Sequence, residues 1–184
     1  MSDTSNWRGR IPVYFFSSSS GMVRQFAERL ERPVFDLAVR DVRRSVPAAA
    51  WVLLTPSYKT GNRANDTIPE AVRRFLWHPL TRRRLVGVMG SGNRNFGSHY
   101  QAACRQIARA SGRPVLFEFE LQGTPWDVED GRRILAALDA DRLSIRDDER
   151  TNHDDALRRT ASTHIDRGGF DPAARGMRRT AEHR

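Results

Sequence analysis

The sequence contains very little of several residue types that define whole classes of protein. Cysteine occurs once, at Cys104, so the chain has no internal disulfide framework and no clustered thiolates of a structural zinc site. No window approaches the roughly 20 apolar residues that span a membrane. The amino terminus also lacks the apolar segment of a signal peptide. We therefore expect a cytoplasmic protein without a membrane partner, and a buried helical thiol at Cys104.

Lysine is almost as scarce as cysteine. Lys59 is the sole lysine among 31 basic residues, so arginine produces nearly all of the positive charge behind the formal net charge of +9. Such a charge is typical of proteins that bind nucleic acid or an acidic protein surface. The arginine pairs are nevertheless spread over several segments, for example Arg43-Arg44 and Arg73-Arg74. This spread favours a solvated surface, and we do not expect nucleic acid as a partner.

The hydrophobic pattern divides the 184 residues into one domain and two polar ends. Residues 1–10 form a basic leader, and the sustained apolar pattern covers residues 11–143. Residues 144–184 are rich in charge and lack apolar periodicity. We expect this C-terminal extension to be flexible or partly helical, with a short helix possible at residues 156–165.

Short apolar runs alternate with segments of helical spacing along the domain. Five runs have the nearly continuous pattern of buried parallel strands: residues 11–16, 34–39, 51–55, 85–89 and 115–121. Four segments have helical spacing: residues 22–30, 69–77, 98–110 and 125–138. The alternation predicts an α/β fold with right-handed crossovers and a parallel sheet that has helices on both faces.

Details of the last strand and helix sharpen this prediction. The final apolar run alternates partly with glutamate, as an edge strand with one wetter face does. Thr124 is placed to cap the helix that follows, with Pro125 at its first position and Asp127 in its first turn.

Ligands of such sheets bind beyond the carboxyl ends of the strands, so the loops there are the candidate site. Residues 17–21 combine four serines with a glycine directly before a helix, a setting that suits a phosphate. The loop has no Walker lysine, which disfavours a nucleoside triphosphate with magnesium. A plain serine cap remains the alternative.

Two further loops offer aromatic rings. In residues 55–62, Tyr58 is suited to stack on a flat ligand, although an ordinary loop with an exposed tyrosine explains the pattern equally well. Residues 90–97 resemble a dinucleotide fingerprint only superficially, because Asn95 stands where a glycine is required and the loop follows the fourth strand. Phe96 is either a lid on a ligand or a plug beneath the loop.

No catalytic or metal site is evident from the remaining polar residues. His78 and His99 lie in different segments without an acidic or nucleophilic partner in a triad arrangement. The fourth loop, residues 120–124, is explained by the cap at Thr124 without any ligand.

Four motifs occur in a specific order: VYFFSSSSG, LTPSY, GVMGSGNRNFG and FELQGT. Together they resemble the flavodoxin-like NrdI family, the flavoprotein accessory to class Ib ribonucleotide reductase, over about residues 11–138. The resemblance implies a sheet in the order 2-1-3-4-5 and flavin mononucleotide (FMN) as cofactor. It also implies the manganese-loaded radical subunit of the reductase as partner, with an unidentified flavin reductase or other electron donor. In the family, reduced flavin and oxygen supply superoxide or peroxide for assembly of a dimanganese-tyrosyl radical.

The same resemblance assigns site residues. Ser17, Ser18, Ser20 and Gly21 are implied around the phosphate, Tyr58 and its neighbours on one side of the flavin ring, and the loop after the fourth strand on the other. The full set of implied cofactor-binding residues is Ser17, Ser18, Ser19, Ser20, Gly21, Met22, Val23, Thr55, Pro56, Ser57, Tyr58, Lys59, Thr60, Gly61, Ser91, Gly92, Asn93, Asn95, Phe96, Gly97, Leu121 and Gly123.

Two positions depart from the family pattern. Met22-Val23 replace a common Asn-Thr, so phosphate affinity should fall unless the charge of Arg24 compensates. Lys59-Thr60 replace glycines. We expect the charge of Lys59 to stabilise the anionic hydroquinone of the flavin, so Lys59→Ala should lower the potential of the semiquinone/hydroquinone couple.

Three functions stay open at this point. The first is an FMN electron carrier and oxidant generator, an accessory protein more than a stand-alone enzyme. The second is an interaction module that has the fold without the flavin and acts through its basic surface. The third is a flavin-dependent reductase with a small substrate of its own. Flavin absorbance separates the second from the others, and turnover with NAD(P)H alone identifies the third.

Overall fold

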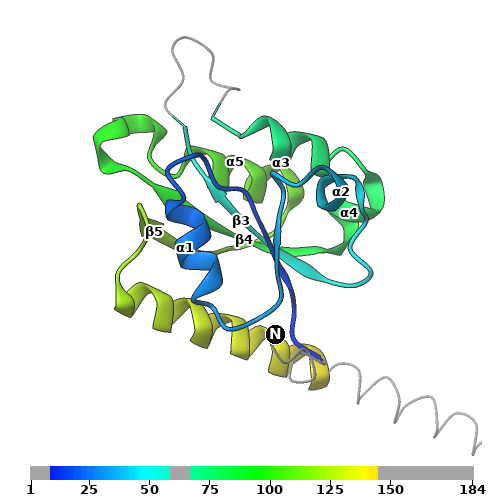
Figure 1. Ribbon diagram of the computed structural model, residues 1–184. Coiled ribbons are helices and arrows are strands. Elements are labelled where there is room, and N and C mark those ends of the chain that lie inside the picture. Colours follow the sequence, from blue (N-terminus) through cyan, green and yellow to red (C-terminus); the bar gives the residue numbers. More distant parts are fainter. Residues whose placement is uncertain (1–8, 59–66, 145–184) are drawn as a thin grey trace, which may run out of the picture. The chain divides into compact units, whose positions relative to one another are not determined.

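A computed structural model describes residues 9–58 and 67–144 of the chain (Figure 1). The contacts divide the chain into two units after Arg142, so the elements below belong to the first unit, apart from the last two described residues. Most of the leader, the loop 59–66 and the expected helix at 156–165 lie outside the described residues.

Five parallel strands form one sheet in the order β2-β1-β3-β4-β5. This confirms the α/β fold and the strand order, with β5 at an edge. The strands are β1 (Val13–Phe15), β2 (Val34–Asp36), β3 (Trp51–Pro56), β4 (Leu85–Gly92) and β5 (Val115–Glu120). The helices are α1 (Met22–Glu28), α2 (Arg40–Arg44), α3 (Glu70–Phe75), α4 (Pro79–Arg84), the 3-10 helix η2 (Arg94–His99), α5 (Ala102–Ser111) and a C-terminal helix over residues 125–144.

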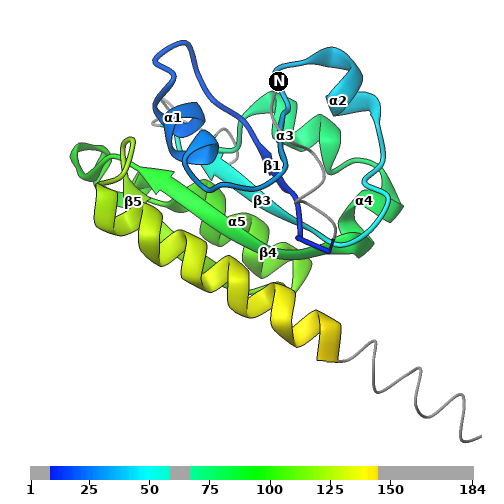
Figure 2. The same ribbon diagram turned by 60° about the horizontal axis from the view of Figure 1, so that its bottom comes forward.

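Both faces of the sheet are covered, as the continuous apolar runs predict. Alternate residues of β3 enter different cores: Val52 and Leu54 pack with Phe26 of α1 and Leu135 of the C-terminal helix. Trp51 and Leu53 pack instead with residues of α3 and α5 on the other face. Figure 2 shows the C-terminal helix running along the sheet on the side of α1. Burial on both faces explains why these strands have no polar alternation.

The C-terminal helix is held at both ends by specific polar contacts. Thr124 and Asp127 form the expected cap, in which Thr124 N donates to Asp127 Oδ2 (2.7 Å) and Asp127 N donates to Thr124 Oγ1 (3.2 Å). Near the other end, Asp139 Oδ1 accepts from the amide of Ile11 (2.7 Å) and pairs with the buried Arg32 through its other oxygen (3.4 Å). The helix is therefore anchored to the start of β1.

The predicted helix at 98–110 is wrong at its beginning. The chain forms η2, turns through Gln101 in a left-handed conformation (φ 57°) and starts α5 only at Ala102. Tertiary contacts fix this turn, because Gln101 Nε2 donates to the carbonyl of Phe119 (2.8 Å) and Ser57 Oγ accepts from Ala103 N (3.0 Å). The helical periodicity of residues 98–110 does not reveal this turn, because contacts with distant segments impose it.

Several other boundaries differ from the predicted ones. β1, β2 and β5 are shorter than predicted, β4 continues through the glycines to Gly92, and α3 lies within residues 70–75. The helices α2 and α4 were not predicted. They have only five and six residues, too few to show a helical periodicity in the sequence. His78 has an ordinary role: its Nδ1 accepts from Leu80 N (3.2 Å) at the start of α4.

Cys104 is fully buried in α5, as expected for a helical core thiol. Burial raises its pKa to about 12, with a further increase from Glu118 and an opposing effect of Arg105. Among the described helices, none combines the length and the apolar character needed to cross a bilayer.

Candidate functional site

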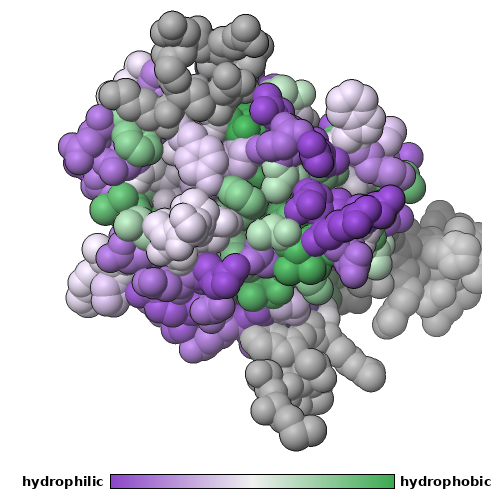
Figure 3. All heavy atoms as spheres, turned by 45° about the horizontal axis from the view of Figure 1, so that its top comes forward, coloured by the Kyte–Doolittle hydropathy of each residue, from purple (hydrophilic) through white to green (hydrophobic). Residues whose placement is uncertain are grey.

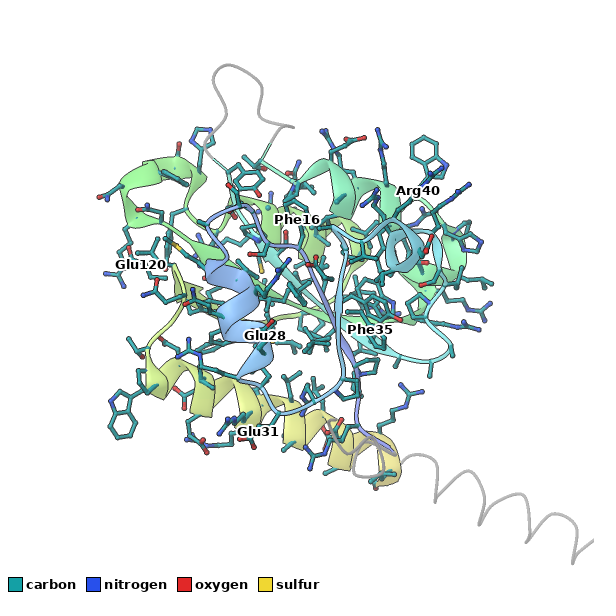
Figure 4. The ribbon with its side chains drawn as sticks, viewed as in Figure 1. Phe16, Glu28, Glu31, Phe35, Arg40 and Glu120 are labelled. Carbon is teal, nitrogen blue, oxygen red and sulfur yellow. The ribbon has the colours of Figure 1, made fainter. Side chains whose placement is uncertain are left out.

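The loops that follow β1, β3, β4 and β5 enclose a cleft of about 220 Å³ at the carboxyl ends of the strands. This is the edge at which the topology predicts a ligand. Figure 4 shows Phe16 near the start of the first of these loops and Glu120 at the end of β5. The cleft is lined by Ser18, Ser20, Met22, Val23, Pro56, Ser57, Tyr58, Ser91, Gly92, Asn93, Phe96 and Leu121.

The serine loop forms a compact turn at the start of α1. Gly21 adopts a left-handed conformation (φ 71°), and its amide donates to the carbonyl of Ser18 (3.0 Å). The hydroxyls of Ser18 and Ser20 lie 2.9 Å apart, and the buried Ser17 Oγ accepts from Arg24 N (3.2 Å).

The same turn leaves backbone donors at the cleft. Within the described residues, the amides of Met22 and Val23 have no backbone or side-chain acceptor, and the first turn of α1 carries no acidic residue. Ser18, Ser20, Met22 and Val23 all line the cleft, so the start of α1 offers hydroxyl and amide donors where an anion is favoured.

Tyr58 forms one aromatic wall and is held through its backbone. Its amide donates to the carbonyl of Thr67 (3.2 Å), and the preceding amide of Ser57 donates to Ser91 O (3.0 Å). The ring lies edge-on to Phe16, with centroids 6.5 Å apart. Burial raises the pKa of Tyr58, and a hydrogen bond with Ser18 opposes part of that rise. The phenol therefore stays protonated at neutral pH.

The opposite wall is locked to the end of β5. Leu121 N donates to the carbonyl of Gly92 (2.9 Å), and Ser91 Oγ donates to Leu121 O (2.6 Å). Arg94 N donates to a carboxylate oxygen of Glu120 (3.2 Å). Phe96 is half-buried above this wall and lines the cleft. The geometry of the loop is thus fixed by neighbours on another strand.

All twelve lining residues belong to the set that the sequence predicts, although their contact with a cofactor stays a prediction. Gly123 packs against Phe26, where a Cβ would come within 2.7 Å of the ring, so its described contacts are structural. Lys59, Thr60 and Gly61 lie outside the described residues. Outside the lining, in the same loops, are Ser17, Ser19, Gly21, Thr55, Asn95 and Gly97.

Arg24 does not offer the free charge considered from the sequence. Its guanidinium forms an ion pair of 2.6 Å with Asp36 at the end of β2. Gln101 was not predicted as part of this region: it is fully buried near the loop after β4, and its Oε1 has no hydrogen-bond partner among the described residues. No signal in the sequence separated Gln101 from an ordinary residue of a surface helix.

The described residues contain no group of three or more His, Cys, Asp or Glu that could hold a metal ion. The lining of the cleft does combine the serine loop with the aromatic rings of Tyr58 and Phe96, the aliphatic Leu121 and the polar Ser57, Ser91 and Asn93. This combination suits a ligand with an anionic group and a flat, largely apolar body.

Comparison with known proteins assigns the chain to a family. The pattern of the family described as NrdI Flavodoxin like matches residues 13–133, which include every residue that lines the cleft. The chain belongs to the NrdI flavodoxin-like family. Protein NrdI of Shigella boydii serotype 4 (strain Sb227) is 41% identical over 121 residues, covering 66% of this chain and 88% of that protein. Protein NrdI of Escherichia coli (strain K12 / DH10B) matches at the same identity and coverage.

A solved structure supports the fold of this NrdI family member. A short-chain flavodoxin associated with a non-canonical PDU bacterial microcompartment matches with a TM-score of 0.51 at 17% sequence identity. The match covers 68% of this chain and 93% of the flavodoxin. At this identity the likeness concerns the flavodoxin-like fold alone.

Proposed function

We propose that the cleft binds FMN and that this protein is a redox accessory of class Ib ribonucleotide reductase. The observation that supports the proposal is the convergence of the serine turn before α1 with Tyr58 and Phe96 at one edge of a flavodoxin-like sheet. Flavin bound there would supply the redox chemistry of the role: electrons from a flavin reductase or other donor would reduce oxygen to superoxide or peroxide for assembly of the dimanganese-tyrosyl radical in the reductase's radical subunit.

In this proposal the phosphate is held without a charged side chain. The hydroxyls of Ser18 and Ser20 and the amides of Met22 and Val23 donate to its oxygens. The backbone supplies donors whatever side chains follow the loop, so Met22 and Val23 lose only the side-chain hydrogen bonds of an Asn-Thr pair. Arg24 stays with Asp36.

Tyr58 and Phe96 flank the flavin ring in the proposed complex. The cleft of about 220 Å³ is smaller than the roughly 300–1,000 Å³ of a typical enclosed ligand site. Part of the ligand therefore remains exposed, which leaves an edge for exchange of electrons with a partner. The protonated Tyr58 adds no negative charge beside the ring.

Titration of FMN and riboflavin into the protein tests the phosphate site directly, because riboflavin lacks only the phosphate. We expect FMN to bind more tightly than riboflavin. The double change Ser18→Ala and Ser20→Ala should weaken FMN by at least about tenfold, since hydrogen bonds to charged groups contribute about 1.5–3 kcal/mol each. Riboflavin affinity should stay within about twofold. Equal losses for both ligands would show that the serines only shape the loop.

The accessory role is tested separately. The FMN-loaded protein is reduced anaerobically and mixed with oxygen and the manganese-loaded radical subunit, and the tyrosyl radical is measured by electron paramagnetic resonance. We expect radical formation in this mixture and far less with free reduced FMN in place of the protein. Flavin binding without radical formation would reject the reductase role and retain the cofactor.

A flavin-free interaction module remains the second candidate, and the basic surface described next is the observation that favours it. Absence of any absorbance or fluorescence change at high FMN would decide for this candidate. Binding of FMN near micromolar affinity or better would decide against it.

A further inference from the structure

A second surface lies away from the cleft and is built by α2, α3, α4 and α5. It contains two cavities of about 460 Å³ and 410 Å³ that share Trp77 and have no residue in common with the cleft. In Figure 4, Arg40 of this surface and Glu120 beside the cleft lie on opposite sides of the view. We call the larger cavity the basic cavity and the other the apolar cavity.

The basic cavity gathers arginines that the sequence separates. Its lining includes Arg40, Arg43, Arg44, Arg74 and His78. Arg74 is already compensated, because its Nε donates to Glu70 Oε1 (2.7 Å) of the same helix. Arg40, Arg43 and Arg44 lie on α2, and the packing of α2 against α3 adds Arg74 of α3 to them. Figure 3 shows hydrophilic side chains at several places on the face that it brings forward, at its right and also at its lower left. The cavity is therefore a local concentration of positive charge.

Two of these guanidinium groups are available to a ligand. Within the part of the chain that the structure describes, neither Arg40 nor Arg44 forms a side-chain hydrogen bond or ion pair. Arg43 is already engaged, because its Nη1 donates to the carbonyl of Leu37 (2.7 Å). A guanidinium is suited to pair with a carboxylate through two parallel hydrogen bonds.

The apolar cavity adds a different kind of contact. Its lining includes Ile68, Leu76, Leu85 and Ile107. Trp77, which it shares with the basic cavity, is 83% exposed. Trp126 is equally exposed (81%), so exposure alone does not mark Trp77; its place between the two cavities does. Tryptophan and arginine are enriched among the residues that dominate protein-protein affinity.

We propose that this surface binds a short acidic segment of a partner protein. The segment's carboxylates pair with Arg40 and Arg44, and its apolar side chains enter the apolar cavity against Trp77. Among the described residues of this surface, Trp77 is the exposed aromatic ring, whereas single-stranded nucleic acid is typically bound by several stacking rings along a charged groove. A simple anion would leave the apolar cavity unused. The proposal concerns residues outside the flavin cleft, so it stands or falls independently of FMN binding.

The probe is a short fluorescein-labelled peptide that alternates glutamate with leucine, measured by fluorescence anisotropy with the FMN-titrated full-length protein. One comparison peptide has serine in place of leucine, and oligo(dT) of equal charge is the second comparison. The test variants are Trp77→Ala and the double variant Arg40→Glu, Arg44→Glu. The matched control reverses two arginines of the C-terminal helix, Arg133→Glu and Arg142→Glu, which line neither cavity.

We expect the affinity for the leucine peptide to fall as the salt concentration rises. The double variant Arg40→Glu, Arg44→Glu should bind this peptide about tenfold or more weakly than the wild type. Trp77→Ala should also weaken peptide binding. In a heteronuclear spectrum of the wild type the peptide should shift one indole N–H signal, and this signal should be missing from the Trp77→Ala spectrum. The control variant should stay within about twofold. Flavin affinity should be the same in all variants.

Three results would overturn the proposal. Equal weakening by the control variant would mean unspecific charge attraction. Equal affinity for the serine peptide would mean that the apolar cavity takes no part. Tighter binding of oligo(dT) than of the leucine peptide would identify a nucleic-acid surface instead.

Discussion

Gly92 is a residue at which the cleft wall has no room for a side chain. A Cβ atom there would lie 2.8 Å from Tyr100 Cδ2 and 3.0 Å from Gln101 Nε2. Gly92→Ala should therefore lower the free energy of unfolding by about 1–3 kcal/mol, as overpacking does, and weaken flavin binding. Urea unfolding and FMN titration measure both. The exposed change Ser98→Ala in the same loop should do neither, and unchanged values for Gly92→Ala would refute the tight packing.

The buried thiol of Cys104 should make the free energy of unfolding depend on pH. Its pKa is raised to about 12 in the folded protein, against about 8.5 in an unfolded chain. Below about pH 8.5 the thiol is protonated in both states and contributes no slope. Above it only the unfolded chain loses the proton, so the free energy of unfolding falls by about 1.4 kcal/mol for each pH unit until about pH 12.

Urea unfolding of the wild type and Cys104→Ala at several pH values isolates this effect, because both proteins keep Tyr14 and Tyr58. We expect parallel stability curves below about pH 8 and a steeper decline of the wild type above it. Iodoacetamide should modify Cys104 only in denaturant. Parallel curves through about pH 10 would show that the thiol ionises in the folded protein.

At the scale of elements, the C-terminal helix depends on the reciprocal cap at its start. Thr124 Oγ1 donates to Asp127 Oδ2 (2.8 Å), in addition to the two backbone hydrogen bonds of the cap. Thr124→Ala and Asp127→Ala should each lower the free energy of unfolding by about 1 kcal/mol. The free energy of unfolding of the double variant should fall by clearly less than the sum of the two single losses, because each single change already breaks the shared hydrogen bonds.

The measurement is a double-mutant cycle by urea unfolding without flavin, with the exposed change Gln122→Ala as the control. Additive losses within about 0.3 kcal/mol would mean that the two side chains act independently.

At the scale of the whole molecule, ligand and fold are linked because the cleft is assembled from loops of four strands. FMN that binds only the folded chain should raise the free energy of unfolding by about 2.7 kcal/mol at a concentration 100 times its dissociation constant. Riboflavin at the same saturation should give the same increase. Calorimetry or urea unfolding at several flavin concentrations measures it. A bound flavin that leaves the unfolding midpoint unchanged would mean binding to the unfolded chain as well.

The order of buried runs determined the fold class from sequence alone. Strands such as Trp51–Pro56 are apolar on both faces, a pattern that requires cover on both sides and so predicts a doubly covered parallel sheet. That topology also fixed the edge where the site lies, since parallel strands end together. The cap at Thr124 and the core thiol Cys104 were readable for the same reason: each depends on residues close by in the chain.

Only the tertiary structure decided features that depend on contacts between distant segments. Gln101 turns the chain because of contacts with β5 and Ser57, which no local periodicity encodes. Arg24 pairs with Asp36 and is not free to act at the serine turn, and the packing of α2 against α3 gathers Arg44 and Arg74 into one cavity. Local pattern determines which segments are strands and helices, whereas the direction of a long charged side chain depends on neighbours that only folding supplies.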